Sequence, residues 1–219
     1  MPTLIPVNQL PTSRLEGLTG FVLVGGASRR MGSRKESLQI DGESMLERQI
    51  RVLRSVARRV LVVGGATGYL DRFDVSVVPD AVAGRGPLGG IYTALVESRT
   101  EFNLVLGCDL PCVSHSLLGC LALRAMAEGS DVTVPVSRDG RLQPLCAVFR
   151  RSVLYAVRTR LALGENKLSG FFPRVHCTAI RWPEFFNAGF RANVFNNMNT
   201  PEDYEYARRR IEGPGVATG

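Results

Sequence analysis

Short apolar runs alternate with helix-like segments along most of the chain. Runs typical of buried strands occupy residues 21–24, 60–63, 75–78, 104–106 and 132–134. Segments with apolar residues at helical spacing predict helices over residues 45–57, 87–96 and 115–126. Strands and helices that alternate in this way predict a single-domain α/β fold, in which a mostly parallel twisted sheet carries helices on both faces.

Turn and cap residues predict one hairpin and one final helix. Asp139-Gly140 is a hairpin turn signal, and we expect residues 145–149 to return from it as a strand, so an antiparallel hairpin interrupts the parallel order. Ser114 is a candidate N-cap of the helix over 115–126. Thr200 precedes Pro201 and two acidic residues, an order that opens a helix.

The length and composition predict one domain. A chain of 219 residues is long enough to bury about 70% of its unfolded surface in one core. Its hydrophobic content of 45% and charged content of 21% are ordinary for a globular protein. We predict an N-terminal extension over residues 1–18, a single domain over 19–212 and a tail over 213–219.

A glycine-rich, basic segment follows the first predicted strand. The strand leads into Gly25 and Gly26, and Arg30 and Lys35 lie shortly after them. Glycines let backbone N–H groups approach a phosphate, and small loops of such groups bind anions. The segment therefore favours a nucleoside triphosphate site, and the alternative is an ordinary loop with basic surface residues.

Two familiar phosphate motifs are excluded. A P-loop has the pattern G-x-x-x-x-G-K-[ST], whereas Gly26 and Gly32 are too far apart and Lys35 is not adjacent to Gly32. A Rossmann fingerprint has the pattern G-x-G-x-x-G and an acidic residue at the end of the next strand, which here ends in Gly64-Gly65. Neither a P-loop NTPase nor an NAD enzyme is favoured.

Two aspartates follow predicted strands. Asp80 follows the run at 75–78, and Asp109 follows the run at 104–106. Ligands of open α/β sheets bind beyond the carboxyl ends of the strands, where the glycine-rich segment also lies. Mg²⁺ binds one or two carboxylates together with phosphate oxygens, so we expect a nucleotide and Mg²⁺ at this edge. The alternative for each aspartate is a helix cap or a turn residue.

The charge distribution gives little support for a nucleic-acid partner. The formal net charge is +7, but the basic residues are scattered, apart from short runs such as Arg208-Arg209-Arg210. No basic run is interleaved with aromatic residues, so we interpret most of this charge as a solvated surface.

The cysteines and the apolar pattern indicate the cellular compartment of the protein. The five cysteines include no C-x-x-C pair, so a zinc site is not expected. Free thiols suit a reducing cytoplasm. No run of eighteen apolar residues and no signal-peptide pattern is present, so we expect a cytoplasmic protein with no membrane partner.

Several segments resemble motifs of the molybdenum cofactor guanylyltransferases, which belong to the GT-A-like nucleotidyltransferases. The family opening, roughly L-x-G-G-x-S-x-R-M-G and then Lys, is matched from Leu23 to Gly32 and by Lys35. The other matching segments are Pro79-Asp80, Gly86-Pro87-Leu88-Gly89-Gly90, Cys108-Asp109-Leu110-Pro111, Gln143-Pro144-Leu145-Cys146-Ala147-Val148 and Phe195-Asn196-Asn197-Met198-Asn199-Thr200-Pro201-Glu202-Asp203. The resemblance covers roughly residues 20–211.

The resemblance implies an enzyme that transfers GMP from Mg²⁺-GTP to the terminal phosphate of molybdopterin carrying molybdenum and releases pyrophosphate. The implied catalytic residues are Arg30, Lys35 and Asp109, of which Asp109 would hold Mg²⁺. The implied nucleotide contacts are Leu23, Val24, Gly25, Gly26, Lys35, Asp80, Pro87, Leu88 and Asp109. The implied pterin contacts are Gln143, Pro144, Asn197 and Asn199. Lys167 is a further candidate that could add positive charge there, and its alternative is a solvated lysine.

Other functions remain open at this point. A cytidylyltransferase acting on the same pterin and a sugar-phosphate nucleotidylyltransferase are the nearest alternatives, although residues 23–26 resemble the guanylyl opening rather than the T-A-A-G of cytidylyl relatives. A catalytically idle nucleotide-binding partner protein is an alternative of another class. One departure is visible: some family members place an Asn after the second strand, where this chain has Gly64-Gly65-Ala66-Thr67, so Thr67 is a candidate substitute. Molybdenum-insertion proteins and molybdoenzymes are possible partners.

Overall fold

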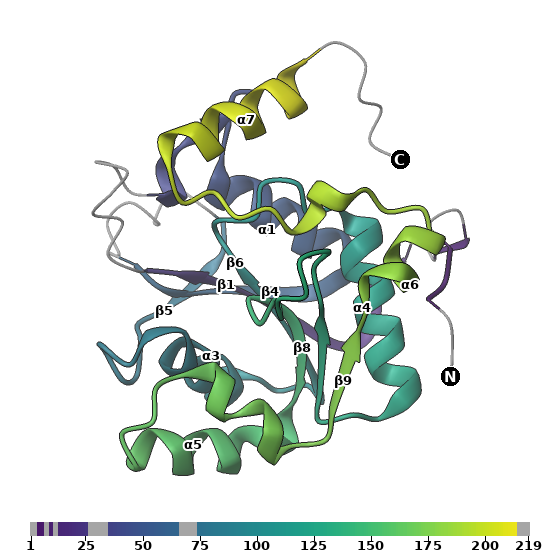
Figure 1. The fold of residues 1–219 in the computed structure, drawn as a ribbon. Helices are drawn as coiled ribbons and strands as arrows, with labels where there is room; N and C mark the ends of the chain where they lie inside the picture. The colour runs from purple at the N-terminus through teal and green to yellow at the C-terminus, as the bar shows by residue number, and fades with distance from the viewer. Residues whose placement is uncertain (1–3, 7–8, 11–12, 26–34, 66–73, 214–219) are drawn as a thin grey trace.

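The computed structural model describes residues 4–6, 9–10, 13–25, 35–65 and 74–213, and a seven-stranded sheet forms its centre. The order across the sheet is β5-β4-β1-β6-β8-β7-β9 (Figure 1). The strands are β1 (Leu15–Val24), β4 (Ala57–Gly64), β5 (Ser76–Val78), β6 (Phe102–Gly107), β7 (Val132–Pro135), β8 (Cys146–Arg150) and β9 (Cys177–Ile180). A separate antiparallel pair consists of β2 (Gln39–Ile40) and β3 (Glu43–Ser44).

The sheet is mostly parallel, as the alternation of strands and helices predicts. β1 pairs in parallel with β4 and β6, and β4–β5 and β7–β9 are also parallel pairs. β8 is antiparallel to both neighbours, β6 and β7. The predicted hairpin is therefore confirmed, and it reverses the direction of one strand.

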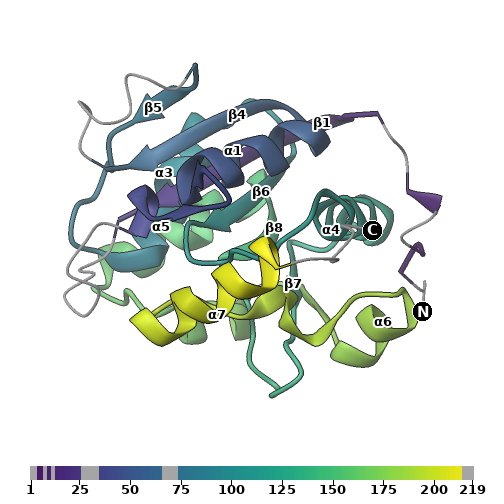
Figure 2. The ribbon, with the colours of Figure 1, turned by 90° about the horizontal axis from the view of Figure 1, so that it is seen from above.

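Helices cover both faces of the sheet (Figures 1 and 2). On one face, α1 (Met45–Val56) and α4 (His115–Glu128) share a buried apolar cluster with β1 and β6. On the other face, α3 (Gly86–Glu97) and α5 (Leu154–Ala162) share a second cluster. Two further helices, α6 (Trp182–Asn187) and α7 (Pro201–Glu212), lie in the C-terminal part of the chain.

The predicted helix starts are confirmed by their hydrogen bonds. The Ser114 side chain accepts from the Leu117 N–H at 3.2 Å. At α7, Thr200 Oγ1 accepts from the Asp203 N–H at 3.2 Å, and Asp203 Oδ2 accepts from the Thr200 N–H at 2.9 Å. This reciprocal arrangement satisfies backbone donors that the first turn of a helix leaves unpaired.

The structure corrects the start of the folded region. β1 begins at Leu15, so residues 15–18, which the sequence pattern assigns to an extension, form the first part of a central strand. Leu18 is buried there, and Leu4 also packs into the core. Small and polar residues on either side of Leu18 interrupt the apolar pattern, so this part of the strand is not evident from the sequence. Of the predicted tail over residues 213–219, the structure describes Gly213 alone.

Some elements lie outside the sequence prediction. The periodicity of the sequence does not predict the β2–β3 pair, the edge strand β9 or the helices α5 and α6. β9 has one fully buried residue, Ile180, so alternation along it is weak. No helix in the described part of the chain is long and apolar enough to cross a membrane.

Candidate active site

A cavity of about 640 Å³ opens at the carboxyl ends of the parallel strands, and we call it the strand-end cavity. Its lining residues are Leu23, Val24, Gly25, Glu36, Val63, Gly64, Asp80, Gly84, Gly86, Pro87, Gly90, Gly107, Cys108, Asp109 and Leu145. The end of the first strand, both aspartates and the start of α3 therefore meet at one place, as the sequence predicts.

Not every predicted nucleotide contact lines this cavity. Leu88 is fully buried and packs in the apolar cluster beneath α3, because its helical position points it toward the sheet. Gly26 and Arg30 lie outside the described residues, as does Thr67. Lys35 begins a short 3-10 helix, Lys35–Ser37, whose next residue, Glu36, lines the cavity.

Glycines let neighbouring segments approach closely at the cavity. Gly64 has a φ of +84°, and a Cβ there would stand 2.3 Å from the Val24 carbonyl oxygen. A Cβ on Gly107 would stand 2.9 Å from Asp109 Oδ1. Such distances are too short for a Cβ unless its neighbours shift, so glycine at these two positions lets the chain segments at the strand ends approach closely.

Asp80 is fixed by α3. Its Oδ1 lies 3.1 Å from Thr93 Oγ1 and accepts from the Val82 N–H at 3.3 Å. Thr93 Oγ1 in turn accepts from the Ala81 N–H at 3.0 Å. The Asp80 carboxylate therefore stabilises the turn between β5 and α3 and also lines the cavity. A role as a turn residue and a role in the site are thus compatible for Asp80.

Besides Asp80 and Asp109, a third carboxylate, Glu36, lines the strand-end cavity. Burial raises the pKa of the Cys108 thiol well above its usual value, and the negative charges of Glu36 and Asp109 raise it further. Glu36 and Asp109 therefore both lie near the same buried thiol. Glu36 is absent from the predicted site residues; its only signal in the sequence is that it directly follows the candidate phosphate-binding Lys35.

The carboxylates of this cavity are candidate ligands for a metal ion. Within the described ranges, no group of three or more His, Cys, Asp or Glu side chains is arranged to hold a metal ion. Mg²⁺ binds few protein carboxylates when phosphate oxygens and water complete its shell. Asp109, at the end of a strand and facing the cavity, fits that kind of partial site.

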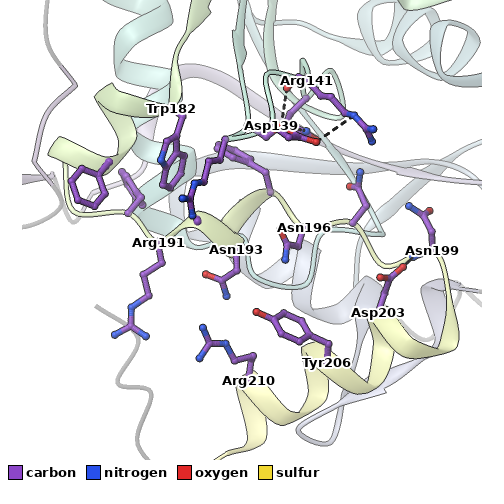
Figure 3. A pocket seen from close by; sticks show the side chains of 18 of the residues that line it. Asp139, Arg141, Trp182, Arg191, Asn193, Asn196, Asn199, Asp203, Tyr206 and Arg210 are labelled. Atoms are coloured by element: carbon purple, nitrogen blue, oxygen red, sulfur yellow. Dashed lines mark hydrogen bonds and ion pairs between the residues drawn. The ribbon is translucent and has the colours of Figure 1, made fainter.

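A second and larger cavity, of about 1270 Å³, lies among α6, α7 and the hairpin turn between β7 and β8 (Figure 3). We call it the asparagine cavity, since Asn193, Asn196, Asn197 and Asn199 line it. Its other lining residues are Ser137, Arg138, Asp139, Arg141, Gln143, Trp182, Phe186, Gly189, Phe190, Arg191, Ala192, Phe195, Asp203, Tyr206 and Arg210. The predicted contacts Gln143, Asn197 and Asn199 thus meet in one cavity.

Met198 fixes the two predicted asparagines in place. Its side chain is fully buried with Ile40 and Met45, whereas Asn197 and Asn199 on either side of it are exposed. Side chains alternate between faces in an extended segment, so a buried Met198 directs both asparagines outward. The Met198 N–H also donates to the Asp109 carbonyl oxygen at 2.8 Å. One residue therefore ties the asparagine cavity to the strand-end cavity.

Two predicted pterin contacts lie elsewhere. Pro144 belongs to the turn closed by the hydrogen bond from the Cys146 N–H to the Gln143 carbonyl oxygen, and it lines neither cavity. Lys167 precedes the 3-10 helix Leu168–Gly170, and Leu168 packs against the apolar cluster of α3 and α5. Figure 1 shows α5 at the opposite end of the molecule from α7. A single lysine without a surrounding motif gave no information on which face its loop occupies.

Comparison with known proteins identifies relatives over most of the chain. Residues 20–177 match the model of the MobA-like NTP transferase domain. A probable molybdenum cofactor guanylyltransferase from Pelotomaculum thermopropionicum is 36% identical over 195 residues, with 89% of this chain and 93% of the relative covered. A second one, from Carboxydothermus hydrogenoformans, is 33% identical and covers 87% of this chain and 95% of its own length.

Solved structures share the fold. Molybdopterin-guanine dinucleotide biosynthesis protein A from Archaeoglobus fulgidus has a TM-score of 0.78 at 22% identity, and the match covers 89% of this chain and 98% of that one. The 2-C-methyl-D-erythritol 4-phosphate cytidylyltransferase from Thermus thermophilus has a TM-score of 0.62 at 17% identity, covering 88% and 98%. At these identities the likeness concerns the fold alone.

Proposed function

Because this chain belongs to the family of MobA-like NTP transferase domains and is a nucleotidyltransferase, we propose that it transfers GMP from GTP to molybdopterin carrying molybdenum. The observation that supports this proposal is the hydrogen bond from the Met198 N–H to the Asp109 carbonyl oxygen, because it joins the segment that lines the asparagine cavity to a residue of the strand-end cavity. The relatives named molybdenum cofactor guanylyltransferases support the choice of base and acceptor.

The strand-end cavity is suited to the nucleotide. Backbone groups of residues 23–26 would contact the base, and Asp80 and Pro87 flank the same space at the start of α3. Arg30 and Lys35 would bind the triphosphate, since both follow the glycines at the end of β1. Asp109 would hold Mg²⁺, which offsets the negative charge of the phosphates when bound.

The reaction itself demands little of the side chains. An oxygen of the acceptor's terminal phosphate forms a bond to the α-phosphorus of GTP, and the bond from that phosphorus to the bridging oxygen of pyrophosphate breaks. The attacking phosphate is already anionic at neutral pH, so no general base is required. Catalysis then rests on positioning the two substrates and on neutralising charge.

The reaction implies a cellular setting. Proteins that insert molybdenum and molybdoenzymes that use the product are the expected partners, and neither nucleic acid nor a membrane is needed. All five cysteines are free, which suits the reducing cytoplasm.

The decisive experiment supplies the protein with Mg²⁺, molybdenum-loaded molybdopterin and each of the four NTPs, and measures pyrophosphate. We expect GTP to be preferred over CTP by at least about tenfold, which corresponds to about 1.4 kcal/mol in transition-state binding. Equal or faster release with CTP would instead identify a cytidylyltransferase. If no NTP yields pyrophosphate with this acceptor, the proposal is wrong.

A further inference from the structure

One face of α7 forms a wall of the asparagine cavity. Tyr206 and Arg210 lie four residues apart, so they project from the same face of the helix one turn after another. The Arg210 guanidinium lies 5.9 Å from the centroid of the Tyr206 ring. Tyr206 is 45% exposed, although it is a large aromatic residue. Figure 3 shows both side chains on the cavity side of α7, across from Asn193 and Asn196.

The neighbours of these two residues in the sequence have structural partners instead. Arg208 forms ion pairs with Glu205 and Glu212, and the Arg209 Nε–H donates to the Glu205 carbonyl oxygen at 3.3 Å. The Tyr204 hydroxyl donates to the Gln39 carbonyl oxygen at 2.6 Å and so joins α7 to β2. Of the three consecutive arginines, Arg210 alone lines the cavity.

The charge of Arg210 is not balanced inside the cavity. Among the described residues, no carboxylate forms an ion pair with Arg210. The acidic residues that line the cavity serve other groups: Asp139 pairs with Arg141, and Asp203 caps α7. An arginine with five donors beside an exposed aromatic ring is a combination that binds a planar, negatively charged ligand.

The opposite wall supplies hydrogen-bonding groups close to the same point. Asn193 Nδ2 lies 3.6 Å from Cys112 Sγ and donates to it. Burial raises the pKa of the Cys112 thiol, whereas the positive charges of Arg48 and Arg210 lower it. Arg210 therefore lies within electrostatic reach of the wall that carries Asn193, across the cavity from α7.

We propose that Tyr206 and Arg210 determine acceptor specificity: the Tyr206 ring packs against the planar ring system of the acceptor, and Arg210 binds an anionic group beside it. This inference rests on the proposed function, since it assigns the acceptor to the asparagine cavity. Met198, next to Asn199 in the chain, is hydrogen-bonded to Asp109, so in this inference the acceptor's terminal phosphate faces the strand-end cavity and its ring system faces α7.

The test uses the only tryptophan of the chain. Trp182 lines the asparagine cavity, and pterins absorb in the region where tryptophan emits, so a bound pterin quenches its fluorescence. The probe is a pterin with a single phosphate ester, titrated into the full chain without GTP. The variants are Arg210→Gln and its matched control Arg209→Gln, which removes an arginine that is also exposed, from the adjacent position outside the cavity.

We expect Arg210→Gln to weaken pterin binding about tenfold or more, because it removes charge-assisted hydrogen bonds, and Arg209→Gln to leave it unchanged. Arg210→Lys keeps the charge without the planar fork and is expected to fall between the two. Tyr206→Leu is expected to weaken pterin binding, whereas Tyr206→Phe, which keeps the aromatic ring, is expected to bind the pterin like the wild type. GTP binding and the melting temperature stay at wild-type values in all five variants.

Two results would overturn the inference. If Arg210→Gln and Arg209→Gln weaken pterin binding equally, Arg210 contributes only as one of several surface charges. Weaker GTP binding in the Arg210 variant would place its role in the nucleotide site. The outcome is separable from that of the proposed function: wild-type release of pyrophosphate from GTP and molybdenum-loaded molybdopterin tests the reaction, whereas the variant titrations test this wall of the cavity.

Discussion

At the scale of single residues, Asp109 combines two roles that a strand end makes possible. Its backbone carbonyl binds the segment that carries the asparagines, and its side chain faces the strand-end cavity beside Gly107. The backbone contact is independent of the side-chain charge. A substitution that changes the charge alone therefore separates metal binding from architecture.

We predict that Asp109→Asn lowers kcat by about 10²-fold or more, because a metal clamp on the reacting phosphoryl group is lost. The melting temperature should stay close to the wild-type value, since the amide is isosteric and the hydrogen bond to Met198 uses the main chain. Steady-state rates of pyrophosphate release and a thermal melt measure the two effects. Wild-type activity at ordinary Mg²⁺ would show that Asp109 only shapes the turn.

A second pair of substitutions tests whether the two cavities bind different substrates. We predict that Lys35→Ala weakens GTP binding by about 1.5–3 kcal/mol, the contribution of charge-assisted hydrogen bonds to phosphate. Asn199→Ala should leave GTP binding near normal and weaken molybdopterin binding instead, since Asn199 lines the asparagine cavity. Separate titrations of both variants with GTP and with molybdopterin give the answer. The assignment is wrong if Asn199→Ala weakens GTP binding as much as Lys35→Ala and spares the pterin.

At the scale of elements, the start of α7 links helix stability to the asparagine cavity. Asp203 Oδ2 accepts from the backbone N–H groups of Thr200 and Asn199, both at 2.9 Å. The cap thereby fixes the backbone of Asn199 where the segment enters the helix. α7 also packs on β2 through Tyr204 and Ala207, so the helix anchors one wall of the cavity to the hairpin after Lys35–Ser37.

We predict that Thr200→Ala lowers the free energy of unfolding by about 1 kcal/mol, because the Asp203 N–H loses its side-chain acceptor. Thr200→Ser keeps a hydroxyl and serves as the control, with stability near that of the wild type. Urea denaturation followed by circular dichroism measures both variants. Equal stability of Thr200→Ala and the wild type would mean that Pro201 and Asp203 suffice to start α7.

At the scale of the whole molecule, a small apolar cluster joins segments that are distant in the chain. Met198 packs with Ile40, Met45 and Ala207, which come from β2, α1 and α7. The cluster lies apart from the two large apolar clusters on the faces of the sheet. It connects the segment after the glycine-rich region with the asparagine segment, so the geometry between the two cavities depends on it.

We predict that Met198→Ala destabilises the fold by about 2–5 kcal/mol, as expected when a buried Met leaves a cavity. Met198→Leu conserves most of the volume and should cost less than about 1.5 kcal/mol. Denaturant titration of both variants provides the measurement. A cost of Met198→Ala below that of Met198→Leu would show that the cluster is loosely packed and does not fix the two cavities.

The features that depend on neighbouring residues could be predicted from the sequence alone. Strands such as β6, helix starts such as Ser114 and Thr200, and the turn at Asp139-Gly140 follow from local periodicity and capping chemistry. Asp80 and Asp109 could be placed in one cavity because parallel strands end at the same edge of a sheet.

Which side chains face a cavity became clear only from the packing of distant segments. This packing directs Leu88 into the core, places Lys167 with the α5 face, and brings Glu36, Tyr206 and Arg210 to cavity walls. These positions depend on how α3, α5 and α7 pack against partners far away in the chain. Local patterns carry no information on such long-range packing, so the strand ends could be predicted from the sequence, whereas the wall formed by α7 could not.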